Sequence, residues 1–115
     1  MKTSIGHYKG WQVITLHGPL VLRNLSDVRT AIDAAADGRE CNIALDLSLT
    51  KLVDSGGVSF LVNLSGRVKE RGGCLVVVGA NSDIQSVFSI VGLEGRIRMY
   101  PSREQFEREC TSTDG

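Results

Sequence analysis

The chain lacks the features that mark several classes of protein. Only two of its 115 residues are proline and 5% are aromatic, so it is not a proline-rich linker. Thirteen basic residues balance thirteen acidic ones, which gives no electrostatic reason to bind nucleic acid or an anionic membrane. Its apolar runs, such as Leu75 to Val78, are far shorter than the roughly 20 residues that a membrane-spanning helix needs.

Cysteine and histidine are also scarce. Cys41, Cys74 and Cys110 are widely spaced, odd in number and without a C-x-x-C pair, so we expect neither a disulfide scaffold nor a metal site. Cys74 opens an apolar run and is expected to be a small buried apolar residue. Residues 1–10 contain no apolar segment typical of a secretory signal. We therefore expect a cytoplasmic protein without membrane insertion, cofactor or nucleic-acid partner.

The hydrophobic periodicity predicts a hairpin followed by alternating helices and strands. The hairpin strands are expected at 3–7 and 11–17, and Gly18-Pro19 ends the second. Later strands are expected at 42–47, 74–78 and 97–100, and helices at about 25–37, 55–71, 82–91 and from 102. The order β-β-α-β-α-β-α-β-α predicts an α/β fold with a mostly parallel sheet of four to five strands and about four helices.

Several details of the helices are also predicted. Asn24 or Ser26 is expected to cap the first helix, and Asn81 or Ser82 the third. Val91 is expected to face inward from the third helix, and Phe106 and Cys110 from the fourth. The other inward residues of the first three helices are expected to be Leu25, Val28, Ile32 and Ala35, then Val58, Leu61, Val62, Leu64 and Val68, then Ile84, Val87 and Phe88.

The segment Asp54-Ser55-Gly56-Gly57 is the leading candidate site. It follows a predicted buried strand and opens a predicted helix, at the sheet edge where functional groups gather in parallel α/β folds. Unpaired N–H groups and the helix dipole favour negative charge there. The glycines are expected to let another molecule approach closely. Ser55 is therefore a helix cap, a nucleophile or a phosphate acceptor.

Catalysis by Ser55 is disfavoured. A serine hydrolase needs a histidine base and an orienting acid near its nucleophile, and the chain has only His7 and His17, both in the N-terminal hairpin. The G-x-S-x-G pattern is absent around Ser55, as is the phosphate-binding pattern G-x-x-x-x-G-K-[ST]. A response-regulator receiver needs an acidic cluster after its first strand, which this chain also lacks. We therefore expect no enzymatic activity.

Several motifs together resemble STAS domains, and more specifically the single-domain bacterial anti-sigma factor antagonists. The motifs are Ile-Ala-Leu-Asp-Leu-Ser at 43–48, Leu-Val-Asp-Ser-Gly-Gly-Val at 52–58, Leu61, Gly72-Gly73, Val87-Phe88 and Val-Gly-Leu at 91–93. The resemblance extends over nearly the whole chain and implies a STAS domain over residues 1–110. The polar residues 111–115 are expected to form a flexible tail.

The resemblance implies a binding module that phosphorylation controls. In that family the serine after the aspartate, here Ser55, accepts phosphate from an anti-sigma factor that is itself a serine kinase. The unphosphorylated form binds the anti-sigma factor and releases a sigma factor, and a serine phosphatase resets the modified form. The partner surface is expected to comprise Asp54, Ser55, Gly56, Gly57, Val58, Ser59 and Asn63, with polar contacts from Arg23 and Asn24.

One loop departs from the pattern of that family. Phosphorylated members carry Gly-Glu-Leu-Asp after the second strand, where this chain has Gly18-Pro19-Leu20-Val21 and therefore neither acid. The alternative is a STAS adaptor that is not phosphorylated, acting as a subunit of a signalling or lipid-transport complex. Val58, Ser59 and Asn63 would then form a permanent docking face. The sequence leaves both interpretations open.

Overall fold

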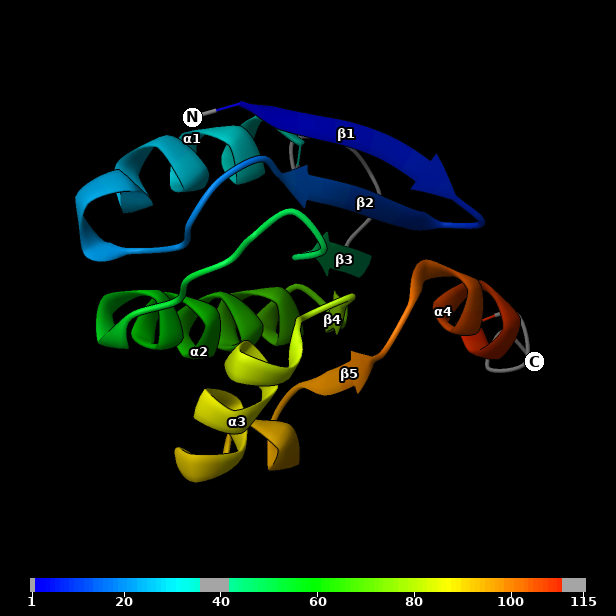
Figure 1. Ribbon diagram of the computed structural model, residues 1–115. Helices are drawn as coiled ribbons and strands as arrows, with labels where there is room; N and C mark the ends of the chain where they lie inside the picture. Colours follow the sequence, from blue (N-terminus) through cyan, green and yellow to red (C-terminus); the bar gives the residue numbers. More distant parts are fainter. Residues whose placement is uncertain (1, 36–41, 111–115) are drawn as a thin grey trace.

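The computed structural model describes residues 2–35 and 42–110, and these form a five-stranded mixed sheet covered on both faces by helices (Figure 1). Strand β1 (Thr3–Tyr8) pairs antiparallel with β2 (Trp11–Leu16) around a tight turn at Lys9 and Gly10. Both turn residues have positive φ, 46° and 86°, as a two-residue hairpin turn requires. The hairpin predicted from the sequence is confirmed.

The remaining strands join the hairpin in the order in which they occur in the chain. Strands β3 (Asn42–Asp46), β4 (Leu75–Val78) and β5 (Arg98–Tyr100) are parallel to β2, and the sheet order is β1-β2-β3-β4-β5. Each parallel connection contains a helix, as crossover connections require. The α/β fold with a mostly parallel sheet and four helices is therefore confirmed.

The helices that connect parallel strands lie on one face of the sheet, and the last helix of the described residues lies on the other (Figure 1). The first face carries α1 (Leu25–Ala35), α2 (Ser55–Glu70) and α3 (Ser82–Ile90). Right-handed crossovers that all step in the same direction along a sheet place their helices on the same side. Helix α4 (Arg103–Cys110) follows the last strand and covers the opposite face. Two short 3₁₀ segments, η1 (Leu22–Asn24) and η2 (Leu93–Gly95), precede α1 and β5.

Strand alternation divides the buried side chains into two cores. Toward α1, α2 and α3, Ile14 and Leu45 of the sheet pack in one cluster with Leu61 and Phe88 of the helices. Toward α4, the second cluster comprises Trp11, Val13, Ala44, Val76, Val78, Tyr100 and Phe106. This two-sided burial explains why residues 43–45 of β3 and the whole of β4 are continuous apolar runs rather than alternating ones.

Some details differ from the sequence-based expectations. Cys74 is exposed, because it lies just before β4 begins and outside both cores. Val91 is 53% exposed, because α3 ends at Ile90 and Val91 occupies its C-cap. Asn24 does not cap α1 but belongs to η1, which runs directly into that helix. Asn81 caps α3, as predicted, by accepting a 2.8 Å hydrogen bond from Ile84 N–H.

Phe106 is fully buried in the second core, as expected. The side chain of Cys110 and the predicted tail at 111–115 lie outside the described residues.

Candidate functional site

The candidate site lies where two loops meet at the carboxyl end of the sheet. The loop after β3 returns toward the loop after β2, and Leu20 forms an isolated parallel bridge with Val53. Leu20 N–H donates to Leu52 O at 2.9 Å, and Asp54 N–H donates to Leu20 O at 3.3 Å. These backbone hydrogen bonds hold the start of α2 against the segment that precedes α1.

Asp54 joins the two loops through its side chain. It is the N-cap of α2, and its Oδ1 accepts a 2.9 Å hydrogen bond from Gly57 N–H. Its Oδ2 accepts a 3.1 Å hydrogen bond from Leu22 N–H in the other loop. The hydrogen bond from Gly57, followed by that from Leu22, lowers the pKa of the Asp54 carboxyl group below its ordinary value of 3.8. Asp54 is therefore ionised in the folded protein at neutral pH.

Ser55 is the first residue of α2 and its side chain is exposed. Because Asp54 is the N-cap, the possibility that Ser55 caps the helix is excluded. Within residues 2–35 and 42–110, the Ser55 hydroxyl forms no hydrogen bond. A hydroxyl at a helix N-terminus is thus left available to another molecule.

The two glycines after Ser55 accommodate this chain's own loop. A Cβ atom on Gly57 would overlap the carbonyl oxygen of Leu20, and Gly57 itself is buried. A Cβ atom on Gly56 would lie 3.0 Å from the Leu22 Cβ atom. The space that was expected to admit a partner is therefore filled by the Leu20–Leu22 backbone, which requires glycine at position 57.

A small hollow adjoins the start of α2. Its volume is about 380 Å³, and it is lined by Val21, Leu22, Arg23, Leu52 and Asp54. Leu22 and Leu52 are 71% and 57% exposed, which is high for large apolar side chains. The hollow therefore combines an ionised carboxylate, a guanidinium group and exposed apolar surface.

The other predicted site residues have separate places. Arg23 lines the hollow, whereas the side chain of Asn24 binds the loop that contains Pro19 and Val21. The Asn24 Nδ2 group donates to Pro19 O at 3.0 Å, and Asn24 Oδ1 accepts from Val21 N–H at 3.1 Å. Asn24 thus shapes the loop beside the site through its contacts with the backbone.

The remaining predicted residues follow the outer side of α2. Ser59 and Asn63 are both exposed and, with Ser55, are spaced four residues apart, so they share one side of the helix. Val58 is half-buried and packs against the core between the sheet and helices α1, α2 and α3. Asn63 lines a shallow groove of about 530 Å³ between α1 and α2, beside Arg29 and Gly66. A partner that covered α2 would contact both the Ser55 end and this groove.

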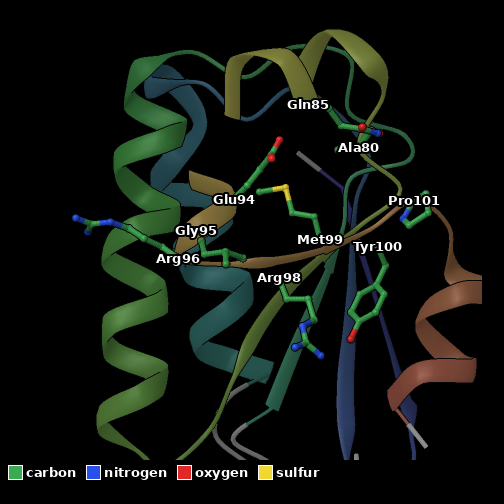
Figure 2. A pocket seen from close by; sticks show the side chains of 10 residues that line it. Ala80, Gln85, Glu94, Gly95, Arg96, Arg98, Met99, Tyr100 and Pro101 are labelled. Atoms are coloured by element: carbon green, nitrogen blue, oxygen red, sulfur yellow. The ribbon is translucent and has the colours of Figure 1, made fainter. Parts of the chain in front are cut away.

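A larger hollow lies elsewhere, along the edge strand β5 (Figure 2). Its volume is about 650 Å³, and none of the predicted site residues lines it. Figure 2 shows the Glu94 and Met99 side chains on one side of β5, with Arg98 and Tyr100 on the other. The hydrogen bond to Tyr100 raises the pKa of Arg98 above its ordinary value. These groups have mixed charge and do not converge on a common point.

The described residues contain no group of three or more His, Cys, Asp or Glu side chains that could hold a metal ion. None of the helices in residues 2–35 and 42–110 has the length and apolar character needed to cross a bilayer. His17 Nε2 lies 2.8 Å from Ser4 Oγ, so the imidazole ring forms a hydrogen bond within the N-terminal hairpin.

The sequence did not identify Leu22 and Leu52 as site residues. Both are leucines in short apolar stretches, and composition alone favours their burial. The signal that could have identified them is their position in loops, because a leucine outside the helical and strand periodicities has no predicted core partner.

Comparison with known proteins agrees with this architecture. An anti-sigma F factor antagonist from Paenibacillus polymyxa is 24% identical over 94 residues, which span 81% of this chain and 80% of that protein. The crystal structure of an anti-sigma factor antagonist from Mycobacterium paratuberculosis superposes with a TM-score of 0.80 at 19% identity, covering 90% of this chain and 88% of that one. The structure of the Bacillus cell fate determinant SpoIIAA in its phosphorylated form superposes with a TM-score of 0.68 at 19% identity, covering 93% of this chain and 98% of that one.

A family model provides the assignment. The model described as "Mlab, STAS domain" matches residues 9–101, which include four of the five strands, the two loops of the candidate site and helices α1 to α3. The solved structures show the same fold, and the motif from Asp54 to Gly57 lies within the matched range. This protein belongs to the STAS domain family.

Proposed function

We propose that this protein is an anti-sigma factor antagonist controlled by phosphorylation of Ser55. In its unphosphorylated form it binds an anti-sigma factor that is a serine kinase, and thereby releases a sigma factor in the cytoplasm. Phosphorylation of Ser55 abolishes this binding, and a serine phosphatase restores it. The protein acts by binding and does not itself catalyse a reaction. The observation that carries the proposal is the exposed Ser55 hydroxyl, which is not used as a cap because Asp54 is the cap.

The position of Ser55 suits a phosphate acceptor. The kinase would transfer the γ-phosphoryl group of ATP to Ser55 Oγ, with ADP leaving and the hydroxyl proton passing to a base of the kinase. The product carries roughly 1.5 to 2 negative charges near neutral pH. The N-terminus of a 16-residue helix tolerates such a charge. The fold therefore accepts the modification.

The same charge opposes a bound partner. Asp54 is already ionised next to Ser55, so the phosphate adds like charge to the surface that a partner would cover. Burying that charge under a partner would also remove its hydration shell, which costs free energy and weakens binding. A coupling free energy of about 1–3 kcal/mol is typical of such switches and changes occupancy many-fold.

The relatives support the proposal. The curated relative from Paenibacillus polymyxa and the Mycobacterium paratuberculosis structure are both described as anti-sigma factor antagonists. The Bacillus protein was solved in a phosphorylated form, so a protein with this fold accepts phosphate.

The direct test is phosphate mapping. The protein is incubated with ATP and with each purified serine-kinase anti-sigma factor of the same organism, and modified residues are located by mass spectrometry. We expect phosphate on Ser55 with at least one kinase and none at this position in Ser55→Ala. Ser86→Ala is the matched control, because Ser86 is also an exposed helical serine but lies on α3, outside the expected partner surface. Failure of every kinase to modify Ser55 would refute the proposal.

A second candidate is an unphosphorylated STAS adaptor in a larger complex. It is favoured by the loop beside Ser55, where residues 18–23 contain no acidic side chain. In that case Ser59 and Asn63 would belong to a permanent interface. A stable complex whose affinity does not change in Ser55→Asp would support the adaptor over the switch.

A further inference from the structure

Exposed apolar side chains lie in the loops beside Ser55. Leu22, Leu49 and Leu52 are 71%, 52% and 57% exposed, and all three belong to the two loops at the start of α2. Leu22 and Leu52 line the same hollow as Asp54. Exposed leucines that adjoin one another mark interaction surfaces more often than scattered ones do.

The backbone holds both leucines in place. Leu22 N–H is bound to Asp54 Oδ2, and Leu52 O accepts a hydrogen bond from Leu20 N–H. The Leu22 Cβ atom also packs closely over Gly56. The two side chains are therefore presented from an ordered backbone, which lowers the entropy lost when a partner covers them.

The charges beside the leucines indicate the chemistry of the partner. Both Asp54 oxygens already accept backbone hydrogen bonds, so this carboxylate does not need a cation from a partner. Arg23 lines the hollow and is exposed, with no ion pair within the described residues. The surface thus fits an apolar side chain flanked by an acidic one.

We propose that Leu22 and Leu52 form an apolar seat for the anti-sigma factor that phosphorylates Ser55, with Arg23 facing an acidic residue of that partner. This inference rests on the proposed function. A kinase that reaches the Ser55 hydroxyl must cover the adjoining hollow, because Asp54 lines the hollow and directly precedes Ser55. An apolar partner side chain at this point also raises the free-energy cost of burying the phosphate, because it displaces water without replacing the lost hydrogen bonds.

The test measures binding and phosphorylation with the purified anti-sigma factor that modifies Ser55. We expect Leu22→Ser and Leu52→Ser each to raise Kd by about tenfold, equivalent to about 1.4 kcal/mol. They should also raise the KM for phosphorylation and leave kcat unchanged, because the seat is not part of the reacting centre. Both side chains are exposed, so Tm should change little.

Ile90→Ser is the matched control. Ile90 is 85% exposed and ends α3, so this variant removes an exposed apolar side chain that the proposed surface does not include. Its Kd and KM should equal those of the unmodified sequence. A similar loss of affinity in Ile90→Ser would show a general effect of surface hydrophobicity and overturn the seat.

The remaining outcomes separate the seat from the switch. Unchanged Kd in both leucine variants, with binding lost in Ser55→Asp, would overturn the seat and leave the proposed function intact. Unchanged binding in Ser55→Asp, or absence of phosphate from Ser55, would overturn the proposed function and the seat with it. Sedimentation analysis tests another occupant: a dimer that Leu22→Ser dissociates, with kinase binding unchanged, would assign the surface to a second copy and overturn the proposal.

Discussion

Asp54 has a larger structural role than the helix cap alone. One oxygen binds Gly57 N–H within α2 and the other binds Leu22 N–H in a separate loop. Both hydrogen bonds favour the ionised form, so they lower the pKa of the carboxyl group. The residue that neighbours Ser55, the proposed phosphate acceptor, therefore also sets the conformation of the surface around it.

The lowered pKa predicts a pH dependence of stability. A group whose pKa is lower in the folded than in the unfolded protein stabilises the fold above its unfolded value, here 3.8, and loses this effect as pH falls through the folded value. Asp54→Asn keeps a capping side chain but removes the titration. We expect the Tm of the unmodified sequence to exceed that of Asp54→Asn at neutral pH, and this difference to shrink below pH 3.8, as measured by thermal unfolding over a pH series. A Tm difference that does not vary with pH would contradict the assignment.

Two glycines of α2 make a matched pair for mutation. Gly57→Ala would drive a Cβ atom against the Leu20 carbonyl oxygen, and we expect it to destabilise the protein by about 1–3 kcal/mol through overpacking. A Cβ atom on Gly66 meets no atom within 4 Å, so Gly66→Ala should stabilise the helix by about 0.5–1 kcal/mol. Urea unfolding measures both changes, and equal effects would contradict the close approach at Gly57.

Sequence reasoning pointed to the start of α2 but left two of its details unresolved or wrong. The sequence analysis considered Ser55 as the cap, whereas the cap is Asp54. Both residue types are good N-caps, and periodicity leaves the start of a helix uncertain by one or two residues. The glycines indicated a close approach, but the approaching segment is Leu20–Leu22 of the same chain. That contact joins residues more than 30 positions apart, which local patterns do not report.

Among the helices of residues 2–35 and 42–110, only α4 covers the second face of the sheet (Figure 1). Its Phe106 is fully buried and forms edge-to-face contacts with Trp11 at 5.3 Å and with Tyr100 at 5.5 Å between ring centroids. One aromatic side chain thus connects the last helix to strands β2 and β5.

Phe106 is therefore expected to dominate the docking of α4. Phe106→Ala should destabilise the protein by about 3–5 kcal/mol, because it removes a fully buried ring. Phe106→Leu should cost less, since it keeps most of the apolar volume. Trp11 is the single tryptophan, so its fluorescence should shift in Phe106→Ala and report the loss of the ring contact. Unchanged stability in the alanine variant would refute this role.

The order of the elements was predictable, and their placement on the sheet only partly so. Alternation of apolar strands with amphipathic segments correctly predicted all five strands and four helices. The apolar face of α4 was visible in Phe106, but periodicity does not indicate which side of the sheet a terminal helix covers. Val91 was wrongly expected to be buried because its spacing continued past the point where α3 ends.

For the molecule as a whole, phosphorylation of Ser55 should leave the fold unchanged. Ser55 is exposed and precedes the packed turns of α2, so a negative side chain there enters no core. We expect Ser55→Asp to abolish partner binding while its Tm stays within a few degrees of the unmodified sequence. Scanning calorimetry measures the Tm and titration calorimetry the binding. A large loss of Tm would mean that lost binding reflects unfolding rather than a switch.

The strand order has a consequence for how the protein is made. Each strand neighbours the one before it in the chain, so every new strand can dock on a surface that already exists. Contacts between nearby segments close with a smaller loss of chain entropy than distant ones do. During synthesis the two loops that surround Ser55 emerge with β2, β3 and α2, ahead of β4, β5 and α4. The two loops around Ser55 thus belong to the earlier-made part of the described residues, and Phe106 is made after Trp11 and Tyr100, the two rings that it contacts.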